Sequence, residues 1–433
     1  MSEPALSRRL GLFDAVVIGL GSMIGAGVFA AFTPAAQAAG SGLLVGLAVA
    51  AVVAWANATS SAQLAAVYPK SGGTYLYGRA VLGPWWGFMA GWSFVIGKIA
   101  SCAAMALIFA AHAAPTGWER PVAVLAVLAL AAVNYRGVTR TARLARVVVA
   151  VSLLSLTLVV ASGVASGVVH EDAQSGIPPS EMAADAASAV LNGGWHGVLQ
   201  SAGLLFFAFA GYARIATMGE EVRDPARTIP RAITIALGIT VVVYAAIAVT
   251  VLSVLGPESV ARSTSPLVDT VTASGWAWAG PVVSIGAAAA SLGALLALMT
   301  GIGRTTLAMA REGDLPRWLS AVHPKFRVPH RAEVALAVVV VVLVLVIDVR
   351  GAIGFSSFGV LLYYFVANAA ALRQPRSQRR YPRALQVFGA VACIVLVATL
   401  PWQAVVVGIA VVAAGALGRL LARTLARRRI RAP

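Results

Sequence analysis

The stretch GLGSMIGAGVF, residues 19–29, places four glycines within nine residues near the middle of a long apolar run. Each glycine weakens a helix by about 1 kcal/mol relative to alanine, so a cluster of glycines favours local unwinding. Unwound backbone at membrane depth is tolerated only where it lines a cavity or is buried in protein. The stretch therefore predicts a broken membrane helix whose free N–H groups could bind a carboxylate. The alternative is helix packing, because Gly21 and Gly25 have the small-residue spacing of packed membrane helices.

The composition of the chain is that of a membrane protein. Hydrophobic residues make up 59% of the 433 residues and charged residues only 11%, whereas soluble proteins carry about a quarter charged residues. The net charge of +17 does not indicate nucleic-acid binding, because the basic residues fall between long apolar runs. Cys102 and Cys393 lie inside apolar stretches, so we expect two buried thiols and no disulfide.

Twelve apolar segments are long enough to cross a bilayer, which takes about 20 residues. We therefore expect an all-α membrane protein with about 12 transmembrane helices, embedded in a lipid bilayer. The first segment reads as a span that is retained rather than as a cleaved leader. The predicted spans are residues 12–38, 42–67, 84–113, 121–138, 144–169, 197–219, 230–256, 276–309, 332–349, 352–372, 384–401 and 402–424.

The Lys and Arg residues are distributed unevenly between alternate loops. With both termini in the cytoplasm, 28 of the 33 fall in inside loops and termini, and only Arg120, Arg262 and Arg350 fall outside. This bias supports an even number of spans and cytoplasmic termini. We expect a multi-pass protein of the plasma membrane, and the Ala- and Arg-rich composition favours a bacterial inner membrane. The Arg-rich tail after Gly418 is expected to lie at the anionic inner leaflet.

A second interrupted helix is predicted in the sixth span. Residues 206–212, FFAFAGY, supply one glycine in an aromatic setting about 185 residues after the first break. Two interrupted helices in corresponding positions of two halves indicate a transport site at the middle of the membrane. The alternative is an aromatic core face.

Three motifs together resemble one family. They are GSMIGAGVF at residues 21–29, GEEVRDPARTIPRA at 219–232 and AMAREGDLP at 308–316. With the chain length and the number of spans, they resemble the amino acid–polyamine–organocation (APC) superfamily. The resemblance implies an inverted 5+5 repeat with broken helices 1 and 6, plus two peripheral helices. We expect a first half at 1–169, an extracellular loop at 170–196, a second half at 197–372, and spans 11 and 12 with a basic cytoplasmic tail at 373–433.

The resemblance also implies where an amino acid binds. Its carboxylate would be held by the span 1 backbone and its amine by carbonyls of spans 1 and 6, with spans 3, 8 and 10 contributing. Carried onto this sequence, the substrate-binding residues are Ser22, Met23, Ile24, Gly25, Ala26 and Gly27 in span 1, and Phe207, Ala208, Phe209 and Gly211 in span 6.

Two positions depart from the pattern of the family. Where many proton-coupled relatives carry a lysine in span 5, this chain has Ser152. Where many relatives carry an acid after the Gly–aromatic pair of span 6, this chain has Ala213 followed by Arg214. A pocket without that carboxylate favours a neutral over a dibasic substrate.

Ionisable residues inside spans are candidates for ion coupling. Lys98 lies 14 residues after Pro84, deep in span 3, where a lysine costs roughly 2.5–3.5 kcal/mol on insertion scales. Our hypothesis is that Lys98 replaces the span 5 lysine as proton carrier or charge mimic; the alternatives are a permanent ion pair or a lysine in a hydrated cavity. Hydroxyls such as Ser152 and Ser291 could coordinate Na⁺, although interhelical hydrogen bonding is the favoured interpretation. H⁺ is therefore preferred over Na⁺ as the coupling ion.

Arg214 is the second cation predicted inside a span. It precedes Glu221 by seven residues, two helical turns, and an arginine is effectively always charged. It could form an intracellular gate with Glu220 or Glu221, or a structural pair with an acid such as Asp14. For Asp14 itself we favour the role of a helix N-terminal charge.

The function expected from these patterns is secondary active transport of an amino acid, preferably neutral, by alternating access with proton coupling or exchange. The alternatives are a polyamine or cationic amino acid carrier and a transporter-like substrate sensor. No His-Glu-x-x-His or Gly-x-Ser-x-Gly motif is present, so we expect no enzyme activity. The histidines lack metal-ligand spacing, and we expect neither metal nor cofactor.

Overall fold

The computed structural model describes residues 10–68, 72–136, 142–169, 181–219 and 221–431. Within these ranges the chain forms helices and no β-strand, apart from one isolated bridge between Leu10 and Val222. The all-α class predicted from the sequence is confirmed.

Eighteen α-helices are joined by short turns in the described part of the chain. They are α1 Leu12–Met23, α2 Ala26–Ala30, α3 Phe32–Ala39, α4 Leu43–Val67, α5 Gly73–Leu82, α6 Pro84–Ala113, α7 Glu119–Tyr135, α8 Ala142–Val169, α9 Met182–Ala189, α10 Trp195–Phe209, α11 Ala213–Ala216, α12 Pro225–Arg262, α13 Pro266–Ala273, α14 Gly280–Arg311, α15 His330–Val346, α16 Val349–Arg373, α17 Arg383–Thr399 and α18 Trp402–Arg431. The short turns of helix are η1 Gly40–Gly42, η2 Val190–Gly194, η3 Ala210–Tyr212, η4 Ala277–Ala279, η5 Arg317–Ser320 and η6 Arg376–Gln378.

Each of the twelve predicted spans corresponds to helix in the structure. Within the described ranges, nine segments are helical, at least 18 residues long and apolar enough to cross a membrane. The other three predicted spans correspond to α7, α15 and α17, each of 17 residues, which is at the short end of the usual range. The division between the last two spans is also confirmed, because α17 ends at Thr399 and α18 begins at Trp402.

Both predicted helix breaks are present. The first span is divided into α1, α2 and α3, with Ile24 and Gly25 between α1 and α2. The expectation that the N–H groups of residues 22–27 are all released is wrong, because α1 continues to Met23 and the Ile24 N–H still donates to the Leu20 carbonyl. The sixth span changes from α10 to η3 at Ala210 and then continues as α11.

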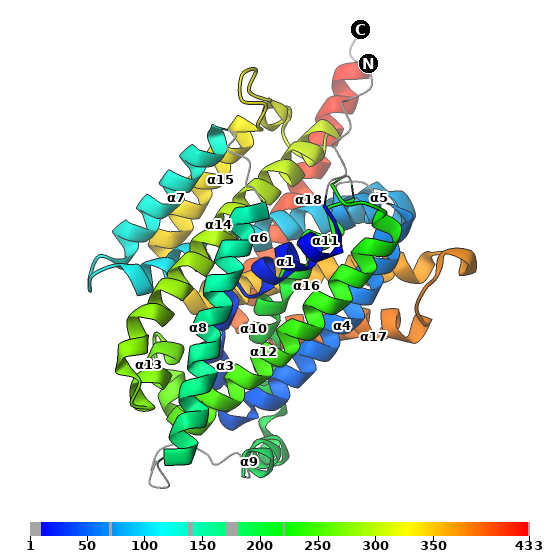
Figure 1. Cartoon of the computed structure of the whole chain (residues 1–433). Helices are drawn as coiled ribbons and strands as arrows, with labels where there is room; N and C mark the ends of the chain where they lie inside the picture. Colours follow the sequence, from blue (N-terminus) through cyan, green and yellow to red (C-terminus); the bar gives the residue numbers. More distant parts are fainter. Residues whose placement is uncertain (1–9, 69–71, 137–141, 170–180, 220, 432–433) are drawn as a thin grey trace.

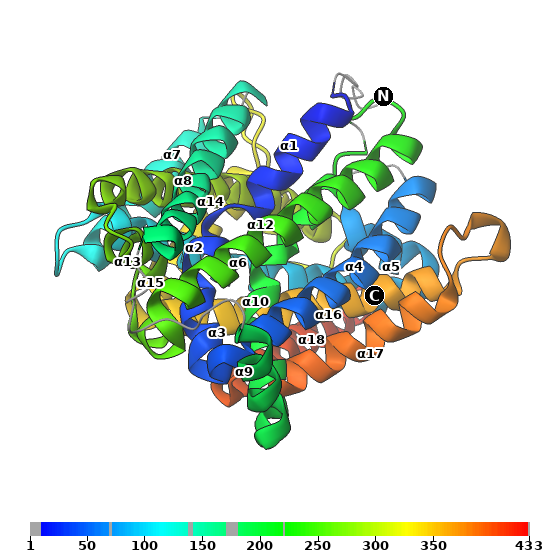
Figure 2. The same ribbon diagram turned by 60° about the horizontal axis from the view of Figure 1, so that its bottom comes forward.

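The two broken helices lie in the middle of the bundle. In Figure 1, α1 and α10 lie in the middle of the view and α7 and α15 pair on one side; in Figure 2, α17 lies at the edge opposite α7. The broken helix α1 packs on α8, α12 and η3, and α6 packs on α14 and α16. α17 packs on α4 and α16, whereas α18 packs on α6 and α16. The last two helices are therefore peripheral, as the resemblance implied.

The outer surface of this bundle is apolar. α15 exposes Val338, Val342 and Val346 at 58%, 51% and 66% of their full area, and α17 and α18 expose similar side chains. A row of exposed apolar residues on helices of this length is what a lipid bilayer covers. The two cysteines are buried and free, in agreement with the prediction. Part of the predicted outside loop, residues 170–180, lies outside the described residues, and α9 supplies its short helix.

Candidate functional site

The broken parts of α1 and α10 touch each other through glycines. A Cβ atom on Gly211 would lie 2.6 Å from the Met23 backbone nitrogen, and one on Gly27 would lie 2.7 Å from Ala208 Cα. Neither position has room for a side chain. Gly25 packs in the same way against Ala294 of α14. The glycine cluster therefore serves close packing as well as the break, so both interpretations of the motif apply.

Tyr244 of α12 ties the two breaks together. Its hydroxyl lies 2.5 Å from the Met23 carbonyl oxygen and 3.1 Å from the Ala208 carbonyl oxygen. Its ring packs on Phe209, with 5.0 Å between centroids. Because Tyr244 is 1% exposed, these carbonyls are satisfied inside the protein.

A cavity of about 220 Å³ extends from this junction to the surface. Its deep end is formed by Ser22, Ser101, Met105 and Phe207, of which Ser101 and Met105 are 2% and 7% exposed. Its other end reaches exposed Arg311, on the side of the molecule rich in Lys and Arg. The lining comes from α1, α5, α6, α10, η3, α11 and α14 and comprises Ser22, Gly72, Tyr75, Phe94, Lys98, Ser101, Met105, Phe207, Ala210, Gly211, Ala213, Arg214, Thr217, Ala294, Ala297, Leu298, Gly301, Arg304, Thr305, Leu307, Ala308 and Arg311.

The predicted substrate-binding residues are divided between the cavity and the packing around it. Ser22, Phe207 and Gly211 line the cavity. The others whose side chains are described do not line it in this conformation and are buried: Met23, Ile24, Gly25, Gly27, Ala208 and Phe209. The side chain of Ala26 lies outside the described part of the chain, although its backbone begins α2.

Lys98 projects from α6 into the deep part of the cavity. It is 6% exposed, and its ammonium donates to the Ala210 carbonyl at 3.4 Å. The Tyr364 hydroxyl of α16 donates to the same oxygen at 3.3 Å. Among the described residues, no carboxylate forms an ion pair with Lys98. The alternative of a permanent ion pair is therefore unsupported, and Lys98 is a cation facing a cavity.

Of the predicted gate residues, Arg214 lines the cavity and Glu221 approaches it from outside the lining. Arg214 of α11 donates to the Thr217 hydroxyl at 3.2 Å and lies 3.7 Å from a Glu221 carboxylate oxygen. Arg304 of α14 lies 3.6 Å from the same oxygen. Glu220 lies outside the described residues. Asp14 pairs instead with Arg146 of α8 at 2.6 Å and accepts from the Gly11 N–H, so it combines its expected role in the first turn of α1 with an interhelical pair.

The two serines proposed for ion coupling bond within their own helices. The Ser152 hydroxyl donates to the Val148 carbonyl at 2.8 Å, and the Ser291 hydroxyl donates to the Ala287 carbonyl at 2.7 Å. Both are buried, and neither lines the cavity. Each hydroxyl oxygen keeps lone pairs that could bind an ion, but neither residue reaches the cavity, so sodium coordination by these two residues stays a prediction.

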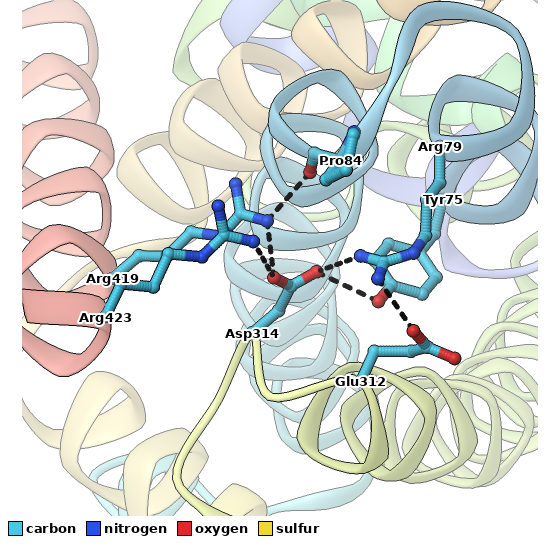
Figure 3. Close-up of polar contacts among 7 residues, drawn as sticks. All are labelled: Tyr75, Arg79, Pro84, Glu312, Asp314, Arg419 and Arg423. Carbon is cyan, nitrogen blue, oxygen red and sulfur yellow. Dashed lines mark hydrogen bonds and ion pairs between the residues drawn. The ribbon is translucent and has the colours of Figure 1, made fainter. Parts of the chain in front are cut away.

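A charged cluster closes the bundle beside the cavity mouth, and Figure 3 shows how its members converge on Asp314. One Asp314 oxygen accepts from the Tyr75 hydroxyl at 3.0 Å and from Arg79 at 3.2 Å. The other oxygen lies 2.5 Å from Arg419 and 3.8 Å from Arg423. This Asp314 cluster joins α5, the turn after α14, and α18, and it also contains Glu312, which pairs with Arg79 at 2.7 Å.

Tyr75 connects the Asp314 cluster to the cavity, because it also lines the cavity. Burial raises the pKa of the Tyr75 phenol, and the negative charge of Asp314 raises it further. The hydroxyl therefore remains a protonated donor to Asp314 at physiological pH.

The position of Arg419 corrects the interpretation of the C-terminal tail. Its side chain is fully buried rather than held at a lipid surface. Its guanidinium lies 4.5 Å and 4.7 Å from the ring centroids of Trp85 and Phe88 and donates to the Pro84 carbonyl at 2.9 Å. The tail prediction failed at this residue because a buried carboxylate and two rings offset the cost of burying the charge.

Sequence reasoning missed the aromatic hydroxyls of the site. Tyr75, Tyr244 and Tyr364 come from three different helices and meet carbonyl or carboxylate oxygens around the breaks. For Tyr244 and Tyr364 the signal that could have found them is a tyrosine in the interior of an apolar span, because a buried phenol needs a hydrogen-bond partner; Tyr75 lies between two spans and carries no such signal. Their partners are 36 to 239 residues away in the chain, and no local pattern specifies such distances.

Comparison with known proteins identifies the family. The amino acid permease family model matches residues 10–417. The uncharacterized transporter Rv1999c of Mycobacterium tuberculosis is 57% identical over 98% of this chain and 93% of its own length. The branched-chain amino acid permease BcaP of Bacillus subtilis is 26% identical over 93% of this chain and 90% of its own length. The chloroplastic cationic amino acid transporter 7 of Arabidopsis thaliana is 28% identical over 86% of this chain and 67% of its own length.

These matches cover nearly the whole chain, including both broken helices and the peripheral α17. The family is one of membrane transporters, not enzymes. The chain belongs to the amino acid permease family of the APC superfamily, and it is an amino acid transporter.

Proposed function

We propose that the protein is a secondary active transporter that carries an amino acid across the plasma membrane by alternating access. The observation that carries this proposal is the cavity at the junction of the two broken helices, which reaches the surface on the Arg-rich side. With that side in the cytoplasm, as the charge bias predicts, the structure is an inward-facing conformation.

The substrate would lie in the deep part of the cavity, between Ser22 and Phe207, with Lys98 beside it. The predicted binding residues that are buried outside the cavity would support the two breaks and could become accessible as they move. The division into halves at 1–169 and 197–372 is part of the proposal, because each half contributes one broken helix to the cavity.

The basic lining opposes the alternative of a polyamine or dibasic amino acid carrier. Lys98, Arg214, Arg304 and Arg311 line the cavity, and none of its described lining residues is acidic. A substrate with net positive charge would meet like charges at Lys98 and Arg214, and the nearby carboxylate of Glu221 is already shared by Arg214 and Arg304. The sequence-based preference for a neutral over a dibasic amino acid is supported by this arrangement.

For coupling, we propose H⁺ symport through Lys98 or exchange of amino acids. Among the proposed coupling residues, Lys98 is the one that lines the cavity. Ser152 and Ser291 bond within their own helices and do not line it. A lysine amine at a membrane-embedded cavity can exchange its proton as the cavity changes sides.

Reconstitution into liposomes tests both the proposed amino acid transport and the proposed coupling. Uptake of a panel of radiolabelled amino acids is measured with and without an inward proton gradient, and with amino acid preloaded inside. Stimulation by the gradient establishes symport, whereas uptake only by preloaded liposomes establishes exchange. Lys98→Met should abolish the stimulation, and exposed Lys325→Met serves as its control. Full gradient-driven uptake by Lys98→Met would exclude the coupling role.

A further inference from the structure

The charges around the cavity are unbalanced. Lys98, Arg214 and Arg304 line it, and Glu221 is the carboxylate that approaches two of them. Glu333 also acts on Arg304, so among the described residues three cations meet two carboxylates, and neither carboxylate pairs with Lys98. Arg311 also lines the cavity near its mouth.

Glu221 does not satisfy the two arginines that it approaches. Its oxygen lies 3.7 Å from Arg214 and 3.6 Å from Arg304, and both distances exceed the usual limit of about 3.2 Å for an N–H···O hydrogen bond. One carboxylate is thus shared loosely by two guanidiniums. Arg214 has five N–H donors, and the Thr217 hydroxyl accepts from one of them.

Lys98 lines the same cavity as Arg214 and is similarly under-compensated. Its ammonium has three donors, and one of them meets the Ala210 carbonyl at 3.4 Å. Ala210 precedes Arg214 by four residues, about one helical turn. Lys98 is 94% buried, since 6% of its surface is exposed, and it faces the cavity. Two cations on neighbouring elements therefore line one cavity.

We propose that this cavity selects amino acids that carry a second carboxylate, so that the substrate has a net charge of −1. One carboxylate would bind Lys98 beside the α1 break, and the other would accept two N–H bonds from the Arg214 guanidinium, a geometry that suits its planar fork. This inference rests on the proposed function and sharpens it, because the earlier preference compared neutral substrates only with dibasic ones.

Acidic amino acids and their amides form matched pairs that test the charge alone. Glutamate and glutamine have nearly the same shape, as do aspartate and asparagine, and at pH 7 only the acids carry the second charge. A hydrogen bond to a charged group contributes a factor of roughly 10 to 100 in binding. We expect uptake of glutamate or aspartate to exceed that of its amide by such a factor in proteoliposomes at equal pH on both sides.

Arg214→Gln tests the assigned partner, and Arg227→Gln is its control, because Arg227 is 78% exposed and does not line the cavity. We expect Arg214→Gln to reduce the acid-to-amide ratio to about one or below, and Arg227→Gln to keep the wild-type ratio. An unchanged ratio in folded Arg214→Gln would overturn the assignment of Arg214.

The wild-type ratio decides the proposal even if a variant does not fold. Uptake of neutral amino acids with no preference for the acids would overturn the charge selection and leave the proposed function standing. Absence of uptake of every amino acid by folded protein, in symport and exchange conditions alike, would overturn both. Preference for the acids over their amides supports both.

Discussion

Removing the carboxylate of Asp314 should destabilise the protein more than removing the arginine closest to it. Asp314→Asn leaves Arg419 buried without a counter-charge and Arg79 without its pair to Asp314. Breaking a buried pair by removing one partner costs about 3–5 kcal/mol. Since the side chains of Asp314 and Arg419 are both fully buried, we expect Asp314→Asn to lower the free energy of unfolding by about that amount.

Arg419→Met should cost less, because Asp314 keeps Tyr75 at 3.0 Å and Arg79 at 3.2 Å. The methionine can also fill the space between the Trp85 and Phe88 rings, where the lost cation–π attraction is on the order of 1–2 kcal/mol. The expected loss is about 1–2 kcal/mol. The order of the two losses in unfolding free energy is therefore a sharper prediction than the size of either loss.

Unfolding of the purified proteins in mixed detergent micelles of increasing SDS content measures both changes. Glu258→Gln is the control, because Glu258 is 85% exposed and its pair with Arg262 is a surface pair, so its effect should stay within about 0.5 kcal/mol. If Arg419→Met were as destabilising as Asp314→Asn, Asp314 would not be the centre of the cluster, and the reasoning would be refuted.

Three further predictions concern the breaks and the cavity. Gly211→Ala should abolish transport, because its Cβ would collide with the Met23 backbone, whereas Gly238→Ala should be tolerated because no atom lies within 4 Å of its Cβ; uptake in proteoliposomes distinguishes them. Tyr244→Phe should lower the free energy of unfolding by about 1–3 kcal/mol, since it leaves buried carbonyls without a donor; equal stability would contradict this. Ala297→Cys, in the cavity lining, should react with a water-soluble thiol reagent from the Arg-rich side only, and labelling from the opposite side would contradict the inward-facing assignment.

Much of the fold could be predicted because membrane spans are specified locally. A run of about 20 apolar residues must form a helix to satisfy its backbone in lipid. The end of a span could also be predicted: the predicted span 230–256 ends at Gly256, where the backbone of α12 leaves the helical conformation with a φ of 72°. The glycines of the first break were also visible as a pattern. The extent of the break was overestimated, because helical hydrogen bonds continue to Ile24.

The parts of the site that could not be predicted depend on contacts between distant segments. Arg419 looks like the other arginines of the tail, and only its approach to Asp314, 105 residues earlier in the sequence, explains its burial. The pairs of Asp14 with Arg146 and of Glu221 with Arg304 likewise join segments that are distant in the sequence. Arg214 and Glu221 are seven residues apart, and their pairing was proposed from the sequence.

The hydroxyl of Tyr244 carries a single hydrogen but faces the carbonyl oxygens of both Met23 and Ala208. At any instant it can donate to one of them and only contact the other. The two half-helices therefore share one hydrogen, and a movement that separates Met23 from Ala208 breaks one of these two contacts.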